Sequence, residues 1–176
     1  MQDIYEKAKQ IRLVIFDVDG VLTDGSLFIG DDGQEYKAFN SRDGHGMKML
    51  QKTGVEIAII TGRTSEVVKH RIKDLGIKIV YQGQHDKTLA FNDLLNSRQL
   101  SPAECAYVGD DVVDLPVMSQ VGLAIAVQDA HPMVKKHAHW LTPSAGGRGA
   151  GRDVCEMILE ARGSLQTELE SYLHKD

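Results

Sequence analysis

Cysteine, proline and aromatic residues are scarce in this chain of 176 residues, and no long apolar run occurs in it. The two cysteines, Cys105 and Cys155, are far apart and suggest neither a disulfide framework nor a zinc knuckle, so we expect small buried side chains in a reducing compartment. No apolar stretch approaches the ~20 residues that would cross a bilayer. These absences exclude a membrane-spanning protein and favour a cytoplasmic one.

Positive charge is also in short supply, with 20 Lys and Arg against 25 Asp and Glu and a net charge of -5. The chain therefore has no basic field for phosphodiester backbones, which argues against nucleic acid as a partner. The 42% of hydrophobic residues exclude a mainly disordered, collagenous or coiled-coil chain. The length corresponds to about one compact unit, so we expect a single domain over residues 1–176.

Short apolar runs recur along the chain and are separated by segments of helical character. They cover residues 11–16, 55–60, 77–81, 105–108 and 123–127. Runs of this kind are typical of strands buried on both faces, and their alternation with helices predicts βαβ units. The predicted fold class is α/β, a Rossmann-like parallel sheet with helices on both faces.

The segments between the runs carry signals for helix ends. Residues 64–75 end at Gly76, and residues 101–104 form a capping-box pattern with proline at the first helical position. From residue 152 to 172 apolar side chains recur every three or four positions, interrupted only at Gly163. We therefore expect a glycine-rich segment and a C-terminal amphipathic helix at about residues 145–176.

One segment breaks this alternation. Residues 27–29 and 36–39 flank a Gly-Asp-Asp-Gly sequence at 30–33. This pattern predicts a small β-hairpin inserted at about residues 25–39.

Polar and charged residues follow the predicted strands, whose carboxyl ends meet at one edge of a parallel sheet. In chain order they are Asp17, Asp19, Thr61, Arg63, Lys87, Asp110, Asp111 and Asp114. Each one alone is explained as a turn, a helix cap or a solvated helix residue, but their coincidence at four strand ends favours a functional site. Clustered carboxylates repel one another at low dielectric, and hard oxygen ligands select a hard cation, so the sequence predicts a Mg²⁺ site.

In this order, Asp17-Val18-Asp19-Gly20, Thr61-Gly62-Arg63, Lys87 and Gly109-Asp110-Asp111 resemble the four motifs of the haloacid dehalogenase superfamily of phosphatases. The resemblance implies a nucleophilic Asp17, a general acid/base Asp19, a phosphate-binding Thr61 and a charge-neutralising Lys87. It also implies Mg²⁺ held by Asp17, Asp110 and the main-chain carbonyl of Asp19.

These roles have a physical basis. A carboxylate attacks a phosphate dianion against electrostatic repulsion, so the metal and Lys87 must offset that repulsion. Asp17 would take up the phosphoryl group as an aspartyl phosphate, which water would then release. Asp19 would protonate the leaving oxygen and later deprotonate the water. Asp111 and Asp114 would orient the metal's waters and Lys87 from outside.

The chain from residue 11 to residue 153 further resembles the capless 3-deoxy-D-manno-octulosonate 8-phosphate phosphatases. The match rests on residues 17–24, the hairpin, and residues 39–44, 60–63 and 146–153. It implies magnesium-dependent hydrolysis of this sugar acid phosphate in lipopolysaccharide biosynthesis. It also implies a homotetramer whose hairpins pack as a barrel and line neighbouring active sites, with the glycine-rich segment folded over an active site. By resemblance the substrate contacts are Asp19, Asn40, Ser41, Arg42, Asp43, Gly44, Lys48, Arg63, Arg71 and Lys87.

Other interpretations stay open at this point. A related nine-carbon sugar acid phosphate is an alternative substrate. A phosphoacceptor receiver-type signalling domain has a similar acidic pocket, but its lysine usually follows the acids, whereas Lys87 precedes Asp110. A phosphosugar mutase must exclude water, which a chain without a cap domain does poorly. We expect His137 and His139 at the surface and assign no role to His45 or His85.

Overall fold

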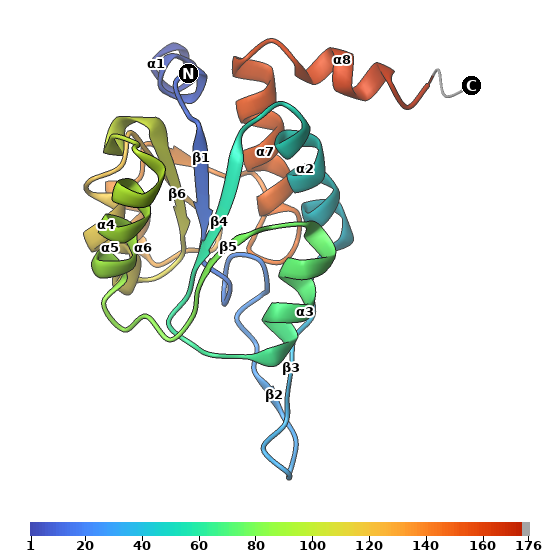
Figure 1. Cartoon of the computed structure of the whole chain (residues 1–176), viewed down its shortest axis with the longest axis vertical. Helices are drawn as coiled ribbons and strands as arrows, with labels where there is room; N and C mark the ends of the chain where they lie inside the picture. Colours follow the sequence, from blue (N-terminus) through green and yellow to red (C-terminus); the bar gives the residue numbers. More distant parts are fainter. Residues whose placement is uncertain (174–176) are drawn as a thin grey trace.

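The computed structural model describes residues 1–173, which fold around a six-stranded sheet in the order β5-β4-β1-β6-β7-β8 (Figure 1). The strands are β1 (Leu13–Phe16), β4 (Glu56–Ile60), β5 (Ile79–Tyr81), β6 (Cys105–Gly109), β7 (Leu123–Ala126) and β8 (Trp140–Leu141). Every neighbouring pair is parallel. The predicted α/β class is therefore confirmed, and β8, too short to show a pattern, extends the sheet by one strand.

The strand order reverses at β1, which pairs with β4 on one side and with β6 on the other. In an open parallel sheet this reversal creates a crevice at the carboxyl ends of the strands, where ligands bind. The segments that follow β1, β4 and β6 therefore face one another.

Helices cover both faces of the sheet (Figure 1). One layer contains α1 (Gln2–Lys9), α2 (Ser41–Lys52), α3 (Glu66–Leu75) and α7 (Ala150–Ala161), and the other contains α4 (Lys87–Arg98), α5 (Leu115–Met118) and α6 (Pro132–His137). Two 3₁₀ turns, η1 (Pro102–Glu104) and η2 (Val112–Asp114), flank β6. No helix among residues 1–173 combines the length and apolar character needed to cross a membrane.

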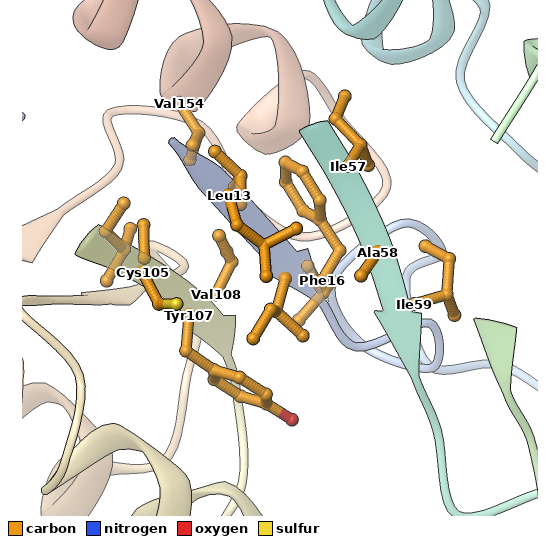
Figure 2. Close-up of a cluster of buried hydrophobic side chains, with 14 of the residues drawn as sticks. Leu13, Phe16, Ile57, Ala58, Ile59, Cys105, Tyr107, Val108 and Val154 are labelled. Atoms are coloured by element: carbon orange, nitrogen blue, oxygen red, sulfur yellow. The ribbon is translucent and has the colours of Figure 1, made fainter. Parts of the chain in front are cut away.

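The core lies on both sides of β1, β4 and β6, as Figure 2 shows for Leu13, Phe16, Ile59 and Val108. All four of these side chains are fully buried. Burying a side chain of this size contributes about 1.5–3 kcal/mol to stability, so the core holds the strands firmly in register. The positions of the polar residues after the strands are fixed as a consequence.

The inserted hairpin is present as β2 (Phe28–Ile29) and β3 (Glu35–Tyr36), which pair antiparallel with Phe28 opposite Tyr36. The N–H group of Gly30 donates to the carbonyl of Gln34 at 2.8 Å and closes the turn. In Figure 1 the hairpin projects away from the sheet beyond the carboxyl ends of the strands.

Two helix predictions need correction. The capping box forms, with the N–H group of Ser101 donating to Glu104 Oε2 at 2.9 Å, but it begins only the single turn η1 because β6 follows at once. The expected C-terminal helix is divided into α7 and α8 (Leu165–Glu170), because the chain turns between them at Gly163, with φ of 73°. The end of that expected helix, at 174–176, lies outside the described residues.

Candidate active site

A pocket of about 350 Å³ opens at the carboxyl ends of β1, β4 and β6. The predicted site residues that line it are Asp17, Asp19, Thr61, Arg63, Lys87, Asp110 and Asp111, and they are joined by Gly25, Gly62, Gln84, His85 and Val113. Segments from four parts of the chain converge here. The residues that follow the strands thus lie together at one edge of the sheet, as the sequence predicts. His85, which has no role from the sequence, is thus placed at the pocket wall.

The floor of the pocket is a buried ion-pair cluster around Lys87, the first residue of α4. Its Nζ lies 2.8 Å from Asp17 Oδ2 and 2.7 Å from Asp114 Oδ1, and it donates to the Tyr107 hydroxyl at 3.2 Å. The side chains of Lys87, Asp17 and Asp114 are 2%, 8% and 0% exposed. A buried charge is tolerated only when it is paired, so these groups depend on one another.

The Asp114 carboxylate contacts both side chains and main-chain groups of this cluster. Its Oδ1 accepts from Lys87 and from the Tyr107 hydroxyl, and its Oδ2 accepts from the N–H groups of Asp110 at 2.9 Å and Asp111 at 3.2 Å. All four acceptor positions of the carboxylate are therefore used. Sequence reasoning missed Tyr107, because a tyrosine inside a buried strand looks like core, although its hydroxyl must find a partner there.

The charges of the cluster shift one another's pKa. Burial raises the pKa of Asp17, and the Asp114 carboxylate adds to the rise while Lys87 opposes it. Burial, followed by the carboxylates of Asp114, Asp17 and Asp111, raises the pKa of Asp110 to about 8. Burial lowers the pKa of Lys87, but Asp17 and Asp114 together raise it above its ordinary value. Without a further cation beside Lys87, the pocket floor therefore favours the protonated form of Asp110.

These carboxylates can hold a cation. Oxygens of Asp17, Asp110 and Asp114 lie within 4.8 Å of one another, but Asp114 has no acceptor position left, so Asp17 and Asp110 are the available side-chain ligands. The Asp110 carboxylate lies against Gly20, where a Cβ would come within 2.0 Å of Asp110 Oδ2. This contact brings Asp110 next to the main chain that follows Asp19. The hard oxygen donors fit Mg²⁺.

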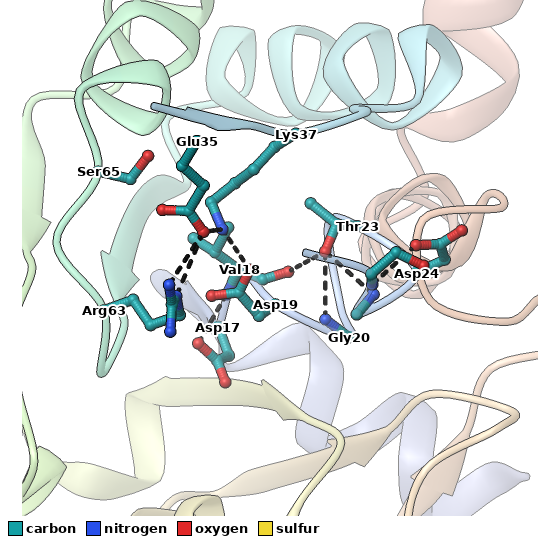
Figure 3. A network of polar contacts seen from close by, with 12 residues as sticks. Asp17, Val18, Asp19, Gly20, Thr23, Asp24, Glu35, Lys37, Arg63 and Ser65 are labelled. Atoms are coloured by element: carbon teal, nitrogen blue, oxygen red, sulfur yellow. Dashed lines mark hydrogen bonds and ion pairs between the residues drawn. The ribbon is translucent and has the colours of Figure 1, made fainter. Parts of the chain in front are cut away.

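The second carboxylate after β1, Asp19, is held by the hairpin (Figure 3). Its Oδ1 lies 2.5 Å from Lys37 Nζ, which also lies 3.0 Å from Glu35 Oε1. The same Glu35 oxygen lies 3.2 Å from Arg63 Nη2. Sequence reasoning missed Lys37 and Glu35, although their alternation with Tyr36 places both on one side of the ribbon.

Known proteins are similar to this chain over nearly its whole length. Residues 77–150 match the sequence model of a family described as haloacid dehalogenase-like hydrolase. The 3-deoxy-D-manno-octulosonate 8-phosphate phosphatase KdsC of Escherichia coli (strain K12) is 51% identical over 163 residues, which cover 93% of this chain and 87% of that protein. The chain belongs to the 3-deoxy-D-manno-octulosonate 8-phosphate phosphatase family.

Solved structures of this family have the same fold. The phosphatase from Yersinia pestis has a TM-score of 0.92 and 49% identity, covering 93% of this chain and 89% of its own. The phosphatase from Moraxella catarrhalis, in complex with magnesium ion, phosphate ion and a KDO molecule, has a TM-score of 0.96 and 40% identity, covering 98% and 99%. The resemblance seen in the sequence is therefore confirmed, and the magnesium-bound relative agrees with the acidic cluster found here.

Several substrate contacts expected from the family do not line the pocket of their own chain. They lie at the N-cap of α2, within α2 and on α3, and they are Asn40, Ser41, Arg42, Asp43, Gly44, Lys48 and Arg71. Asn40 caps α2 by accepting from the N–H groups of Arg42 and Asp43. Arg71 donates to the Asn40 carbonyl at 3.1 Å and lies over the Phe39 ring. These residues are thus engaged within the fold, whereas Ser41, Arg42 and Lys48 are exposed.

Asp43 is buried between two helices. Its Oδ1 accepts from the N–H group of Arg152 at 2.9 Å, in the first turn of α7, and its Oδ2 has no hydrogen-bond partner. Burial raises the pKa of Asp43 to about 6, against the opposing effect of the Arg152 N–H group. In this chain Asp43 therefore ties α2 to α7.

The glycine-rich segment lies against the loop that follows β1. The N–H group of Gly147 donates to the Val21 carbonyl at 2.9 Å, and a Cβ on Gly146 would come within 1.8 Å of the Gly20 carbonyl oxygen. Arg148 also pairs with Asp24 at 3.2 Å. This segment therefore packs on the loop at residues 20–24 and does not line the pocket of its own chain.

Proposed function

We propose that this protein is a magnesium-dependent phosphatase that hydrolyses 3-deoxy-D-manno-octulosonate 8-phosphate to the free sugar acid and phosphate. The observation that carries the proposal is the convergence of Asp17, Lys87 and Asp110 at the pocket floor. The family member from Moraxella catarrhalis holds magnesium, phosphate and KDO, the sugar acid 3-deoxy-D-manno-octulosonate. These are the expected metal and both products of the proposed reaction. The reaction supplies the sugar acid for lipopolysaccharide biosynthesis.

The first step forms a bond between an Asp17 carboxylate oxygen and phosphorus and breaks the bond from phosphorus to the sugar oxygen. Asp19 donates its proton to that oxygen as it leaves. Lys87 stands 2.8 Å from Asp17 and reduces the repulsion between the carboxylate and the phosphate. Mg²⁺, when bound to Asp17, Asp110 and the Asp19 carbonyl, supplies further positive charge to the phosphoryl oxygens.

The second step returns the enzyme to its starting state. Asp19, now ionised, takes a proton from water, whose oxygen attacks phosphorus and displaces the Asp17 carboxylate. Thr61, at the end of β4, and the main chain after it hold the non-bridging oxygens. Asp114 fixes Lys87 by their 2.7 Å ion pair, and Asp111 orients the metal's waters.

Substrate binding divides into two groups of residues in this proposal. Arg63 lines the pocket and is the cation offered to the sugar acid from the same chain. Ser41, Arg42 and Lys48 are exposed on α2, where they are free to serve the site of a neighbouring subunit. Four buried or half-buried residues hold these contacts in place: Asn40, Asp43, Gly44 and Arg71.

We further propose a homotetramer that assembles through the hairpin. Leu27, Phe28, Ile29 and Tyr36 are 44%, 58%, 61% and 57% exposed, and they lie together on a projecting ribbon. A concentration of large apolar side chains at the surface marks an interaction site. Sedimentation of the purified protein tests this, and a stable active monomer would reject it. Two free, buried thiols, Cys105 and Cys155, support a cytoplasmic location.

A substrate panel tests the assigned reaction. Phosphate release with Mg²⁺ should be fastest from 3-deoxy-D-manno-octulosonate 8-phosphate, slower from a nine-carbon sugar acid phosphate and slowest from a phosphosugar without a carboxylate. Equal rates across the panel would reject the substrate. Preference for the nine-carbon ester would favour the alternative phosphatase.

A further inference from the structure

Lys37 has a buried side chain on a ribbon whose other residues are exposed or half-buried. Its side chain is 0% exposed, and its Nζ lies 2.5 Å from Asp19 Oδ1 and 3.0 Å from Glu35 Oε1 (Figure 3). Its sequence neighbour Tyr36 is 57% exposed and points to the other side of the ribbon. The hairpin therefore carries Phe28 and Tyr36 on one side, and Lys37 and Glu35 on the side that reaches the pocket rim.

Two carboxylates hold the Lys37 ammonium group in a buried position. A lysine side chain ordinarily keeps its charged end in water, and removing it from water costs free energy unless it is paired. Here the compensating partners are a carboxylate of the hairpin and a carboxylate of the site. The pairing with Asp19 thus fixes one orientation of that carboxylate at the rim.

We propose that Lys37 is a positioning residue for Asp19, holding its carboxylate where it exchanges protons with the leaving oxygen and with water. The proposal rests on the acid/base role of Asp19 given above. When Asp19 donates its proton to the departing sugar oxygen, a negative charge appears on the carboxylate. The Lys37 ammonium balances that charge and keeps its own protons throughout, and Asp19 regains its proton from water.

Glu35 anchors Lys37 independently of Asp19. One of its oxygens, Oε1, lies 3.0 Å from Lys37 Nζ and 3.2 Å from Arg63 Nη2, so it joins the hairpin to the segment after β4. Burial raises the pKa of Glu35, but Lys37 and Arg63 lower it by more, so the group stays ionised. The lysine is therefore held in place before substrate arrives, which is what positioning a proton donor requires.

The test separates proton donation from general damage by the choice of leaving group. A sugar oxygen needs a proton to leave, whereas p-nitrophenolate leaves without one. The Mg²⁺-loaded enzyme is followed in single turnovers with enzyme in excess, so that only cleavage of the ester bond is observed. Lys37→Met should slow cleavage of 3-deoxy-D-manno-octulosonate 8-phosphate by about 100-fold, the cost of a misplaced catalytic group. Cleavage of p-nitrophenyl phosphate should slow by less than about threefold, because general acid catalysis contributes little there.

Companion variants make the result decisive. Lys37→Arg should recover part of the rate, since it keeps the positive charge. Glu35→Gln, which leaves the buried lysine paired with Asp19, should give a smaller loss with the same dependence on leaving group, and it serves if Lys37→Met does not fold. Lys136→Met removes an exposed lysine on α6 and is the matched control, with both rates unchanged.

Two outcomes overturn the proposal. Equal losses for the two esters in Lys37→Met and Glu35→Gln, or an unchanged rate with the sugar ester, would show that Lys37 does not position Asp19. Asp19→Asn is measured in parallel: if it too lacks dependence on the leaving group, the acid role of Asp19 fails with the proposal. If Asp19→Asn shows the dependence and the Lys37 variants do not, the proposed function stands and only the role of Lys37 is rejected.

Discussion

The pocket floor and the hairpin are built on opposite principles. In the floor, Asp17, Lys87 and Asp114 are almost fully buried, follow or flank strands of the sheet, and satisfy one another's charges. The hairpin has two-residue strands and exposes Phe28 and Ile29 to solvent. The strands of the sheet thus determine where the side chains of the floor lie. The position of the hairpin instead depends on its contacts, which are with Asp19 in the same chain and, as proposed, with other subunits.

The largest expected effect comes from changing Asp17, the proposed nucleophile in the pocket floor. Asp17→Asn keeps the side-chain volume but cannot form the acyl phosphate, so phosphate release should fall by more than about 10⁴-fold. The fold should persist, because the pair between Lys87 and Asp114 remains. Phosphate assays and thermal unfolding of the same preparation check both parts. Near-normal turnover in this variant would refute the mechanism.

A large loss of stability should follow from changing the buried support of the floor. Asp114→Asn removes one partner of a buried ion pair and should cost about 3 kcal/mol of unfolding free energy. Urea unfolding measures the loss. Asp31→Asn, at the exposed hairpin turn, is the control and should stay within about 0.5 kcal/mol. An equal loss of unfolding free energy in the two variants would show that the floor does not contribute more to stability than the hairpin.

The floor should also respond to pH through its metal. Burial first, and then the neighbouring carboxylates, raise the pKa of Asp110 to about 8 from an ordinary 3.8. Between these two values the folded state keeps a proton that the unfolded state has lost, so the metal-free protein should become less stable as pH rises through this window. Because Mg²⁺ needs the ionised carboxylate, its affinity should increase about ninefold from pH 6 to 7 and about fivefold from pH 7 to 8.

Isothermal titration at several pH values measures that affinity. Asp110→Asn should bind Mg²⁺ weakly and lose most of the pH dependence. A steep dependence that persists in the variant would assign it to another group, with Asp17 the first to examine, since burial raises its pKa too.

The smallest effect on stability should come from the hairpin surface. Phe28→Ser with Tyr36→Ser should change the unfolding free energy of the subunit by less than about 0.5 kcal/mol, because both side chains are already exposed. The same change should dissociate the proposed tetramer, as sedimentation would show. Leu89→Ser, at a 67% exposed position on α4, is the matched control and should leave assembly intact.

The sequence predicts the residues of the pocket floor better than it predicts the contacts of the hairpin. Asp17, Lys87 and Asp110 could be placed together because each follows a strand or begins the next helix, and buried parallel strands bring those ends to one edge. Lys37 could not, since its partner Asp19 is 18 residues away and the alternation along the hairpin does not show which part of the chain its charged side chains meet. Asp43 and Arg152 are 109 residues apart, and no local pattern reveals that a residue of α2 caps α7. In the sequence, Gly163 interrupts the apolar pattern of residues 152–172, but nothing there indicates that the chain turns at this residue.

Gly146 packs against Gly20, and Gly20 packs against Asp110. Neither glycine has room for a Cβ, so even alanine would collide with its neighbour at these two positions. A saturation library at these two positions should therefore return almost only glycine among active clones. The hairpin turn should accept most amino acids in the same screen. Mutations can thus change the exposed hairpin and the assembly proposed to depend on it, whereas the backbone beside Asp110, the proposed metal ligand, tolerates almost no change.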